Sequence, residues 1–255
     1  MELAFDDAGR GDCVVLIHGH PFDRTLWAPQ LAQLSGGFRV IAPDLRGFGR
    51  STVTPQLVTM REYAADIEEL LDRLGIERAA VVGLSMGGLV AMELAAFRPW
   101  RYWAVGLVAT TMRPPTAQDR ETRLERAAAV ERDGMAVLVD YMHTGLYGPT
   151  CPPAVRARVD AMMEAAPPAG AAAALRGRAE RPDYRPLLAG LDIPALVCAG
   201  SADPWSDQAV TAEIVATLKR PETVIIDGVG HLPNLEAESE FNAALGAFLR
   251  AHAPG

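Results

Sequence analysis

The stretch GLSMG at residues 83–87 places Ser85 between two glycines, one two positions before it and one two positions after it. Glycine weakens the interior of strands and helices, so this pair indicates a tight turn that needs backbone room. An apolar run at residues 79–82 precedes the turn, and a helix-like segment follows it. A serine on a sharp strand-to-helix turn is exposed at the sheet edge, beside the positive end of the helix. Ser85 is therefore predicted to be a catalytic nucleophile.

A serine hydroxyl needs a general base, and His231 is the histidine best placed to serve as one. It follows the last apolar run of the chain, in a loop that Gly228, Gly230 and Pro233 enforce. Loops at strand ends commonly carry catalytic residues. The other four histidines are His18 and His20 after the first long apolar run, His143 in a helical segment and His252 near the end.

The base in turn needs a carboxylate that fixes its tautomer, and the segment GSADPWSD offers Asp203 and Asp207. The strand that follows Ser85 ends in VATTMRPP, which excludes a carboxylate from that position. Ser206 is a plausible N-cap for the next helix, and the helix dipole would explain an acidic residue at Asp207. Asp203 has no such structural reason, and we predict that it is the acid.

Acyl transfer also needs two amide donors directed at the developing oxyanion. The amide of Met86, the residue after the nucleophile, is predicted to be one of them. The loop HGHPFDRTLW points to the amide of His20 as the other, and His18 is predicted to tie this loop together.

The elements that would position these residues alternate between strands and helices. Short apolar runs predict strands at 13–19, 38–44, 79–85, 104–111, 195–200 and 223–228. Helical periodicity marks residues 59–75, 207–220 and 238–252. Strands that read as buried on both faces belong to parallel sheets, so the sequence predicts an α/β fold with a mostly parallel, doubly wound sheet.

Residues 112–190 interrupt the alternation with four helical segments and no convincing strand. Because this insertion leaves from a strand end, we expect it to be a helical cap over a core formed by residues 1–111 and 191–255. The cap would supply much of the pocket. Met135, Leu138, Met142, Met162 and Met163 are candidate lining residues, or equally ordinary contacts between cap helices.

Composition narrows the possible partners. The 255 residues carry a net charge of −8 and a single lysine, Lys219, without a basic stripe. This pattern argues against nucleic acid and anionic membranes and leaves a small molecule as the partner, with the oligomeric state undetermined. Three widely spaced cysteines and the lack of an apolar N-terminal segment predict a cytoplasmic protein. No dinucleotide, Walker-type or zinc-ligand motif is present, so no cofactor or metal is expected.

Five sequence blocks, spread over essentially the whole chain, resemble motifs of the α/β-hydrolase superfamily. HGHP, APDLRGFGRS, GLSMGG, GSADP and GVGHLPNLE match its recurrent motifs in order and spacing. The chain is similar to small capped serine esterases, enol-lactonases and cofactor-free perhydrolases of the non-haem haloperoxidase type. The resemblance implies a Ser85, Asp203 and His231 triad, with the His20 and Met86 amides as the oxyanion hole.

The resemblance also implies a serine hydrolase that cleaves a small, largely apolar ester, thioester or lactone through an acyl-enzyme. Perhydrolysis, carbon–carbon bond hydrolysis, acyl transfer and a non-catalytic receptor on the same fold are the alternatives. Epoxide hydrolases and dehalogenases with HGxP carry aspartate where this chain has Ser85. Carbon–carbon hydrolases often have Trp where this chain has Leu232, and His20 replaces the usual aromatic residue.

Overall fold

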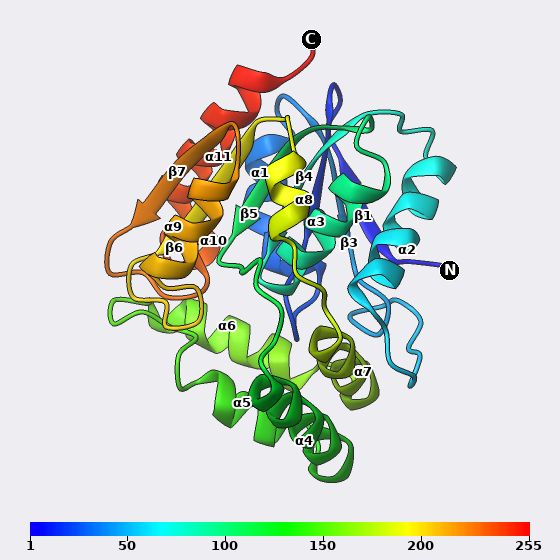
Figure 1. Cartoon of the computed structure of the whole chain (residues 1–255), viewed down its shortest axis with the longest axis vertical. Helices are drawn as coiled ribbons and strands as arrows, with labels where there is room; N and C mark the ends of the chain where they lie inside the picture. The colour runs from blue at the N-terminus through cyan, green and yellow to red at the C-terminus, as the bar shows by residue number, and fades with distance from the viewer.

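A seven-stranded sheet forms the centre of the protein in a computed structural model that describes residues 1–255 (Figure 1). The spatial order is β1-β3-β2-β4-β5-β6-β7. The strands are β1 (Phe5–Ala8), β2 (Cys13–Ile17), β3 (Arg39–Pro43), β4 (Ala79–Leu84), β5 (Tyr102–Val108), β6 (Ala195–Gly200) and β7 (Pro221–Ile226). All pairs are parallel except β1 with β3, which confirms the predicted α/β fold.

The strand β1 was not predicted from the sequence. It is an edge strand of four residues, FDDA, and none of them is fully buried. An edge strand that faces solvent needs no continuous apolar run, so the signal that reveals the buried strands is absent here.

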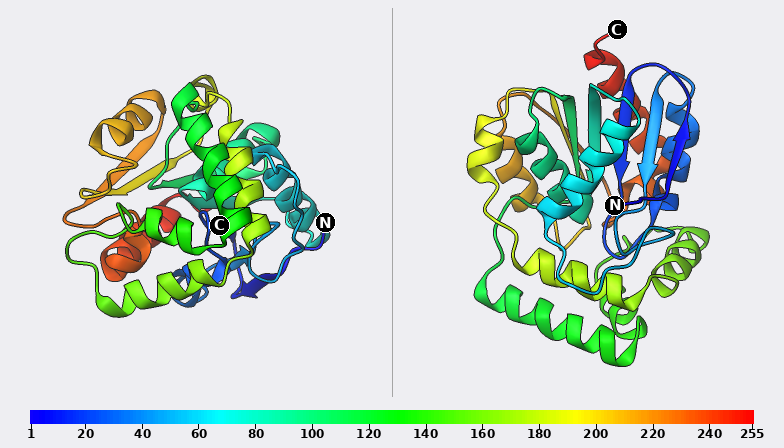
Figure 2. Two further views of the ribbon diagram at one scale, coloured as in Figure 1. Left: turned by 90° about the horizontal axis from the view of Figure 1, so that it is seen from below. Right: turned by 90° about the vertical axis from the view of Figure 1, so that its right-hand side faces the viewer.

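Helices cover both faces of the sheet, as the right-hand view of Figure 2 shows. One face carries α1 (Ala28–Leu34), the short α10 (Pro233–Glu236) and α11 (Glu238–His252). The other carries α2 (Met60–Arg73), α3 (Met86–Phe97), α8 (Arg185–Gly190) and α9 (Gln208–Thr217). A 3₁₀ turn, η1 (Arg24–Trp27), precedes α1. No helix is both long enough and apolar enough to cross a bilayer.

The helix α2 illustrates how the sequence fixes these elements. Thr59 and Glu62 form a capping box in which each side chain accepts a hydrogen bond from the other residue's amide. The apolar residues of α2 recur at helical spacing, and four of them are buried: Tyr63, Ile67, Leu70 and Leu71.

The four predicted helices of the insertion are α4 (Ala117–Asp133), α5 (Ala136–Met142), α6 (Pro153–Glu164) and α7 (Pro168–Ala179). They gather at one end of the molecule, seen from below in the left-hand view of Figure 2. A fifth helix, α8, lies within the expected cap range but contacts α3 of the core, where the Tyr184 hydroxyl donates to Glu93 Oε1 (2.8 Å). The layer over the sheet end therefore consists of α4–α7.

Close backbone contact joins α7 to the core. A Cβ on Gly177 would lie 1.7 Å from the carbonyl oxygen of Val58, so only glycine fits at this position. This contact holds α7 against the loop between β3 and α2.

Candidate active site

Ser85 lies on the turn between β4 and α3, with φ 55° and ψ −112°. This positive φ is uncommon outside glycine and marks a strained backbone. A Cβ on Gly83 would lie 2.0 Å from the carbonyl oxygen of Gly87, and a Cβ on Gly87 would lie 2.2 Å from that of Ile17. Glycine is therefore required on both sides of the turn. The Thr110 hydroxyl donates to the carbonyl oxygen of Ser85 at 2.8 Å.

The loop after β2 packs directly against this turn, because β2 and β4 are neighbours in the sheet. A Cβ on Gly19 would lie 3.3 Å from Cβ of Ser85. The amide of His20, next along the loop, has no hydrogen-bond acceptor in the protein. The amide of Met86 is the first of α3, and the first amides of a helix have no partner within the helix. The structure thus brings both predicted amide donors to the pocket that contains Ser85.

His231 and Asp203 form a buried pair after β7 and β6. His231 Nδ1 lies 2.7 Å from Asp203 Oδ2, and the side chains are 4% and 0% exposed. Asp203 also accepts hydrogen bonds from the Trp205 amide (2.8 Å) and the Ser206 hydroxyl. Burial alone would raise the pKa of the Asp203 carboxyl, but the charge and hydrogen bond of His231 and the other two donors lower it below its ordinary value. Asp203 is thereby held as a carboxylate.

Asp207 does not reach this pair. It is itself the N-cap of α9, and its side chain accepts a hydrogen bond from the Val210 amide at 2.9 Å. The prediction that Ser206 caps this helix is wrong, because the Ser206 hydroxyl turns to Asp203 instead. Asp207 thus has a structural role at the start of α9, but as the N-cap and not as the first-turn acidic residue that was predicted.

The loop that carries His231 is fastened to the cap. The His231 amide donates to the carbonyl oxygen of Leu146 at 2.9 Å. The Glu236 carboxylate accepts hydrogen bonds from the amides of Gly148 (2.8 Å), Gly230 (3.1 Å) and Leu232 (3.2 Å). Glu236 belongs to the sequence block GVGHLPNLE, but its position in the sequence did not predict these three hydrogen bonds.

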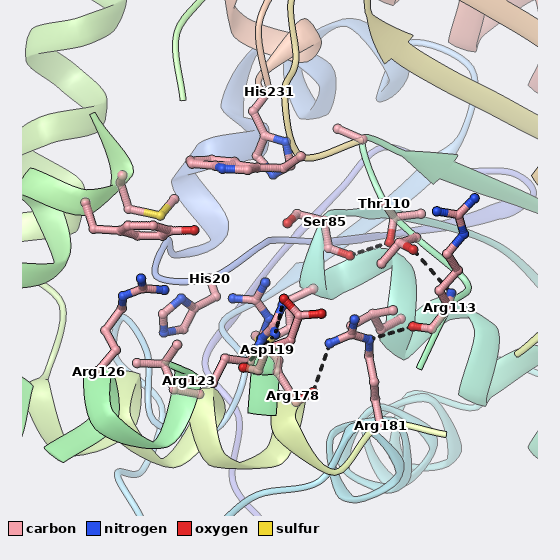
Figure 3. A pocket seen from close by; sticks show the side chains of 18 of the residues that line it. His20, Ser85, Thr110, Arg113, Asp119, Arg123, Arg126, Arg178, Arg181 and His231 are labelled. Carbon is pink, nitrogen blue, oxygen red and sulfur yellow. Dashed lines mark hydrogen bonds and ion pairs between the residues drawn. The ribbon is translucent and has the colours of Figure 1, made fainter. Parts of the chain in front are cut away.

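Ser85 and His231 line one pocket between core and cap, with a volume of about 420 Å³ (Figure 3). No hydrogen bond joins their side chains here; such bonds often tighten only when substrate binds. Trp205 packs edge-on against the His231 ring at 4.9 Å between centroids, and Tyr141 stacks on Trp205. These two rings extend the wall from the core into the cap.

The prediction of a largely apolar substrate does not fit the lining of this pocket. Only eight of its 22 lining residues are hydrophobic, whereas five are arginines. Leu138 and Met142 line it as predicted, but Met135, Met162 and Met163 do not and belong to the hydrophobic core. Four of the arginines form two pairs with a spacing of three residues, Arg123 with Arg126 and Arg178 with Arg181, and this spacing was the available sequence signal.

Two buried histidines hold the loop after β2. His18 Nδ1 donates to the carbonyl oxygen of Gly19 (2.8 Å), and its Nε2 accepts from the Leu45 amide (2.9 Å), so the prediction that His18 ties this loop is confirmed. His20 Nε2 donates to the carbonyl oxygen of Ala171 in α7 (3.0 Å). Burial, assisted by the charge of Arg178, holds the pKa of His20 well below its ordinary value. Both rings are therefore neutral in the folded protein.

Between pH 7.5 and 5.5, the free energy of unfolding is expected to fall by about 1.4 kcal/mol more for the wild type than for His20→Phe. The unfolded chain binds a proton at His20 with the ordinary pKa of 6.5, whereas the folded protein does not. The stability is thus fully present above pH 6.5 and is lost as the pH falls below that value. Urea unfolding followed by tryptophan fluorescence at both pH values measures the difference. If the free energy of unfolding fell by the same amount in both proteins, His20 would be protonated in the native state at the lower pH.

The same His20→Phe variant is expected to retain ester turnover while changing its preference among substrates. Only the backbone amide of His20 is assigned to the oxyanion, and phenylalanine keeps that amide. Steady-state kinetics on a set of acyl chain lengths would show the change. A folded His20→Phe protein without turnover would assign the imidazole itself to the chemistry.

No group of three or more His, Cys, Asp or Glu side chains is arranged to hold a metal ion. All three cysteines are free and buried. The titratable side chains that line the pocket are those of His20, His231, Asp119, Tyr141 and the five arginines, and Asp203 lies behind His231.

Comparison with known proteins gives consistent results. A family model described as alpha/beta hydrolase fold matches residues 12–238. The chain is 30% identical to 3-oxoadipate enol-lactonase 1 of Acinetobacter baylyi, over 90% of this chain and 85% of that protein. A thermophilic esterase from Thermogutta terrifontis, solved with malate bound, superposes with a TM-score of 0.97 at 38% identity, covering 98% of this chain and 94% of that one. An enol-lactonase from Burkholderia xenovorans superposes with a TM-score of 0.90 at 28% identity, covering 97% and 96%.

Proposed function

The chain belongs to the alpha/beta hydrolase fold family, and from this premise we propose that it is a serine hydrolase that cleaves a small carboxylic ester, thioester or lactone through an acyl-enzyme. The observation that carries this proposal is the buried His231–Asp203 pair, in which Nδ1 lies 2.7 Å from Oδ2. His231 lines the same pocket as Ser85, which lies on a strained turn. A serine, a base and an acid that orients the base are the three parts that nucleophilic acyl transfer needs.

In the proposed mechanism, Ser85 Oγ attacks the carbonyl carbon while His231 Nε2 takes its proton. Asp203 occupies Nδ1, which leaves Nε2 as the basic nitrogen, and its carboxylate stabilises the imidazolium that forms. The amides of His20 and Met86 would donate to the oxyanion, which is where charge develops in the transition state. His231 then protonates the leaving oxygen or sulfur, and the same base activates the water that releases the acid.

The relatives support both ester and lactone substrates. The similar proteins are named as an esterase and as enol-lactonases, and a lactone is a cyclic ester that opens by the same attack. In a lactone the leaving alcohol stays attached to the acyl group, so no separate alcohol has to depart before water attacks. One catalytic arrangement therefore serves both classes.

The experiment that tests the proposal is labelling with an ethoxy fluorophosphonate. We expect one adduct per chain on the tryptic peptide 79–101, in which Ser85 is the only serine, together with parallel loss of 4-nitrophenyl butyrate turnover. Ser35→Ala, which changes a partly exposed serine outside the pocket, serves as the matched control and should label fully. An adduct on another peptide, or turnover that survives complete labelling of Ser85, would contradict the mechanism.

A further inference from the structure

Four guanidinium groups face the pocket from the cap. Arg123 and Arg126 come from α4, Arg178 comes from α7, and Arg181 follows α7 directly. Figure 3 shows these side chains in the lower half of the pocket, below Ser85 and His231. A fifth arginine of the lining, Arg113, is neutralised by an ion pair with Glu213 and is left out of this cluster. The four form the arginine cluster.

The arginine cluster lacks the carboxylates that would balance its charge. Arg178 makes no ion pair and its guanidinium donates no hydrogen bond, and Nε of Arg178 is buried without a partner. Arg181 donates only to the carbonyl oxygens of Arg113 and Arg178, both at 3.0 Å. Arg126 lies over the Tyr141 ring, 3.3 Å from its centroid.

Asp119 is the single acidic residue in the pocket lining. Its carboxylate accepts hydrogen bonds from Thr116 in a capping box and lies 3.9 Å from the nearest nitrogen of Arg123. One carboxylate already engaged at a helix start cannot neutralise four guanidinium groups. The pocket therefore has a net positive charge inside a protein whose net charge is −8.

The outer side of the same two helices provides a contrast. Arg176 of α7 pairs with Glu131 of α4 at 2.5 Å, and Arg120 of α4 pairs with Glu180. Arginines that only join α4 to α7 thus have carboxylate partners, and the arginines that face the pocket do not. An unpaired buried charge is costly, so it persists where a ligand supplies the partner.

The mutual repulsion of the cluster affects its ionisation. Burial, followed by the charges of Arg123 and Arg181, lowers the pKa of Arg178 to about 9. Burial and the charge of Arg123 lower the pKa of Arg181 to about 10. Both groups remain protonated at neutral pH, and a bound anion would relieve the repulsion.

We propose that the arginine cluster binds a carboxylate of the substrate that is separate from the ester or lactone bond being cleaved. The inference rests on the proposed function and specifies its substrate class as half-esters or lactones of dicarboxylic acids. A guanidinium binds a carboxylate through two parallel hydrogen bonds, which also fixes its orientation. Anchoring at the cap would hold the reacting carbonyl against Ser85 on the opposite side of the pocket.

The first test compares monomethyl esters of succinate, glutarate and adipate with the corresponding dimethyl esters. These pairs are close in size but differ in charge. For at least one chain length, we expect kcat/KM of the monomethyl ester to exceed that of the diester at least tenfold. Arg178→Gln should lower this preference by about tenfold to a hundredfold, the range for a lost hydrogen bond between charged groups. Arg123→Gln should lower it in the same direction.

Arg176→Gln is the matched control, since it removes a charge from the same helix on the side away from the pocket. It should leave the preference unchanged. Arg178→Gln should also melt at the wild-type temperature or above it, because it removes an unpaired charge, and this result would separate lost binding from lost folding.

Calorimetry on Ser85→Ala separates this inference from the proposed function. This variant should bind one monomethyl ester of the series and bind the dimethyl ester at least tenfold more weakly, and adding Arg178→Gln should abolish the difference. If 4-nitrophenyl butyrate is hydrolysed but no charge preference appears in kinetics or calorimetry, the arginine inference is overturned while the hydrolase proposal stands. If the variant prefers the charged ester in binding but the wild type hydrolyses no ester, the hydrolase proposal fails and the anion subsite remains.

Discussion

Replacing Ser85 by alanine is expected to lower kcat for 4-nitrophenyl butyrate by the order of 10⁶, the loss found when a serine-protease nucleophile is removed. Oγ of Ser85 is the only atom removed, and no base or oxyanion donor can replace the bond that it forms with the acyl group. The residual rate would come from the oxyanion amides and the pocket alone. Stopped assays at high protein concentration, on protein free of wild-type contamination, measure the effect.

The fold should not change in Ser85→Ala. Alanine adds no atom to the crowded turn, and the backbone bonds that hold it, Ser85 N to the Val108 carbonyl oxygen (2.8 Å) and the Thr110 hydroxyl to the Ser85 carbonyl oxygen (2.8 Å), do not use the side chain. Thermal melting should therefore agree with the wild type. A folded Ser85→Ala protein that retains substantial turnover would remove Ser85 from the mechanism.

Replacing Asp203 by asparagine is expected to lower kcat by the order of 10⁴, by analogy with the serine-protease triad. The asparagine amide can occupy the same site, but as a donor toward Nδ1 it would favour the tautomer with its proton on Nε2. That nitrogen could then no longer accept the serine proton. Because the lost carboxylate also accepts hydrogen bonds from Trp205 and Ser206, melting curves must accompany the kinetics.

Asp207→Asn provides the matched control for this prediction. Asp207 accepts a hydrogen bond from the Val210 amide as the N-cap of α9, and asparagine caps helices about as well as aspartate. Most of the activity and stability should therefore remain. If two folded variants showed the reverse pattern, the acid function would belong to Asp207.

The sequence was sufficient to predict the elements that present the site. Continuous apolar runs identify the parallel strands, including the edge strand β7, whose residues are mostly not buried. Ser85, Asp203 and His231 follow the ends of such strands, which places them at one edge of the sheet. The strand β1 escaped prediction because it lies at the sheet edge and two aspartates interrupt its four residues, FDDA, so it has no continuous apolar run. The choice of Asp203 over Asp207 rested on the predicted start of the next helix, which is a local effect. Asp207 does lie at that start, although it is the cap in place of Ser206.

The character of the pocket could not be predicted in the same way. Whether Arg178 faces substrate or pairs with a carboxylate depends on how α7 lies against α4, and the paired Arg176, two residues away, shows that both outcomes occur on one helix. Methionines were an unreliable guide because they fill helix contacts as readily as pockets. Local sequence patterns define helices and strands, but the pairing of charges between distant segments is decided by tertiary packing.

The attachment of the His231 loop to residues 146–148 has a consequence for recombination within the family. The His231 amide bonds to Leu146, and the Glu236 carboxylate joins Gly148 to Gly230 and Leu232. A chimaera that exchanges residues 112–190 for the helices of another hydrolase would therefore remove the acceptor that fixes the backbone of its own base. Such a graft needs residues 146–148 of the host retained, or Glu236 and its loop transferred with the incoming helices. The His231 loop and residues 146–148 thus form one hydrogen-bonded unit, although the chain separates them.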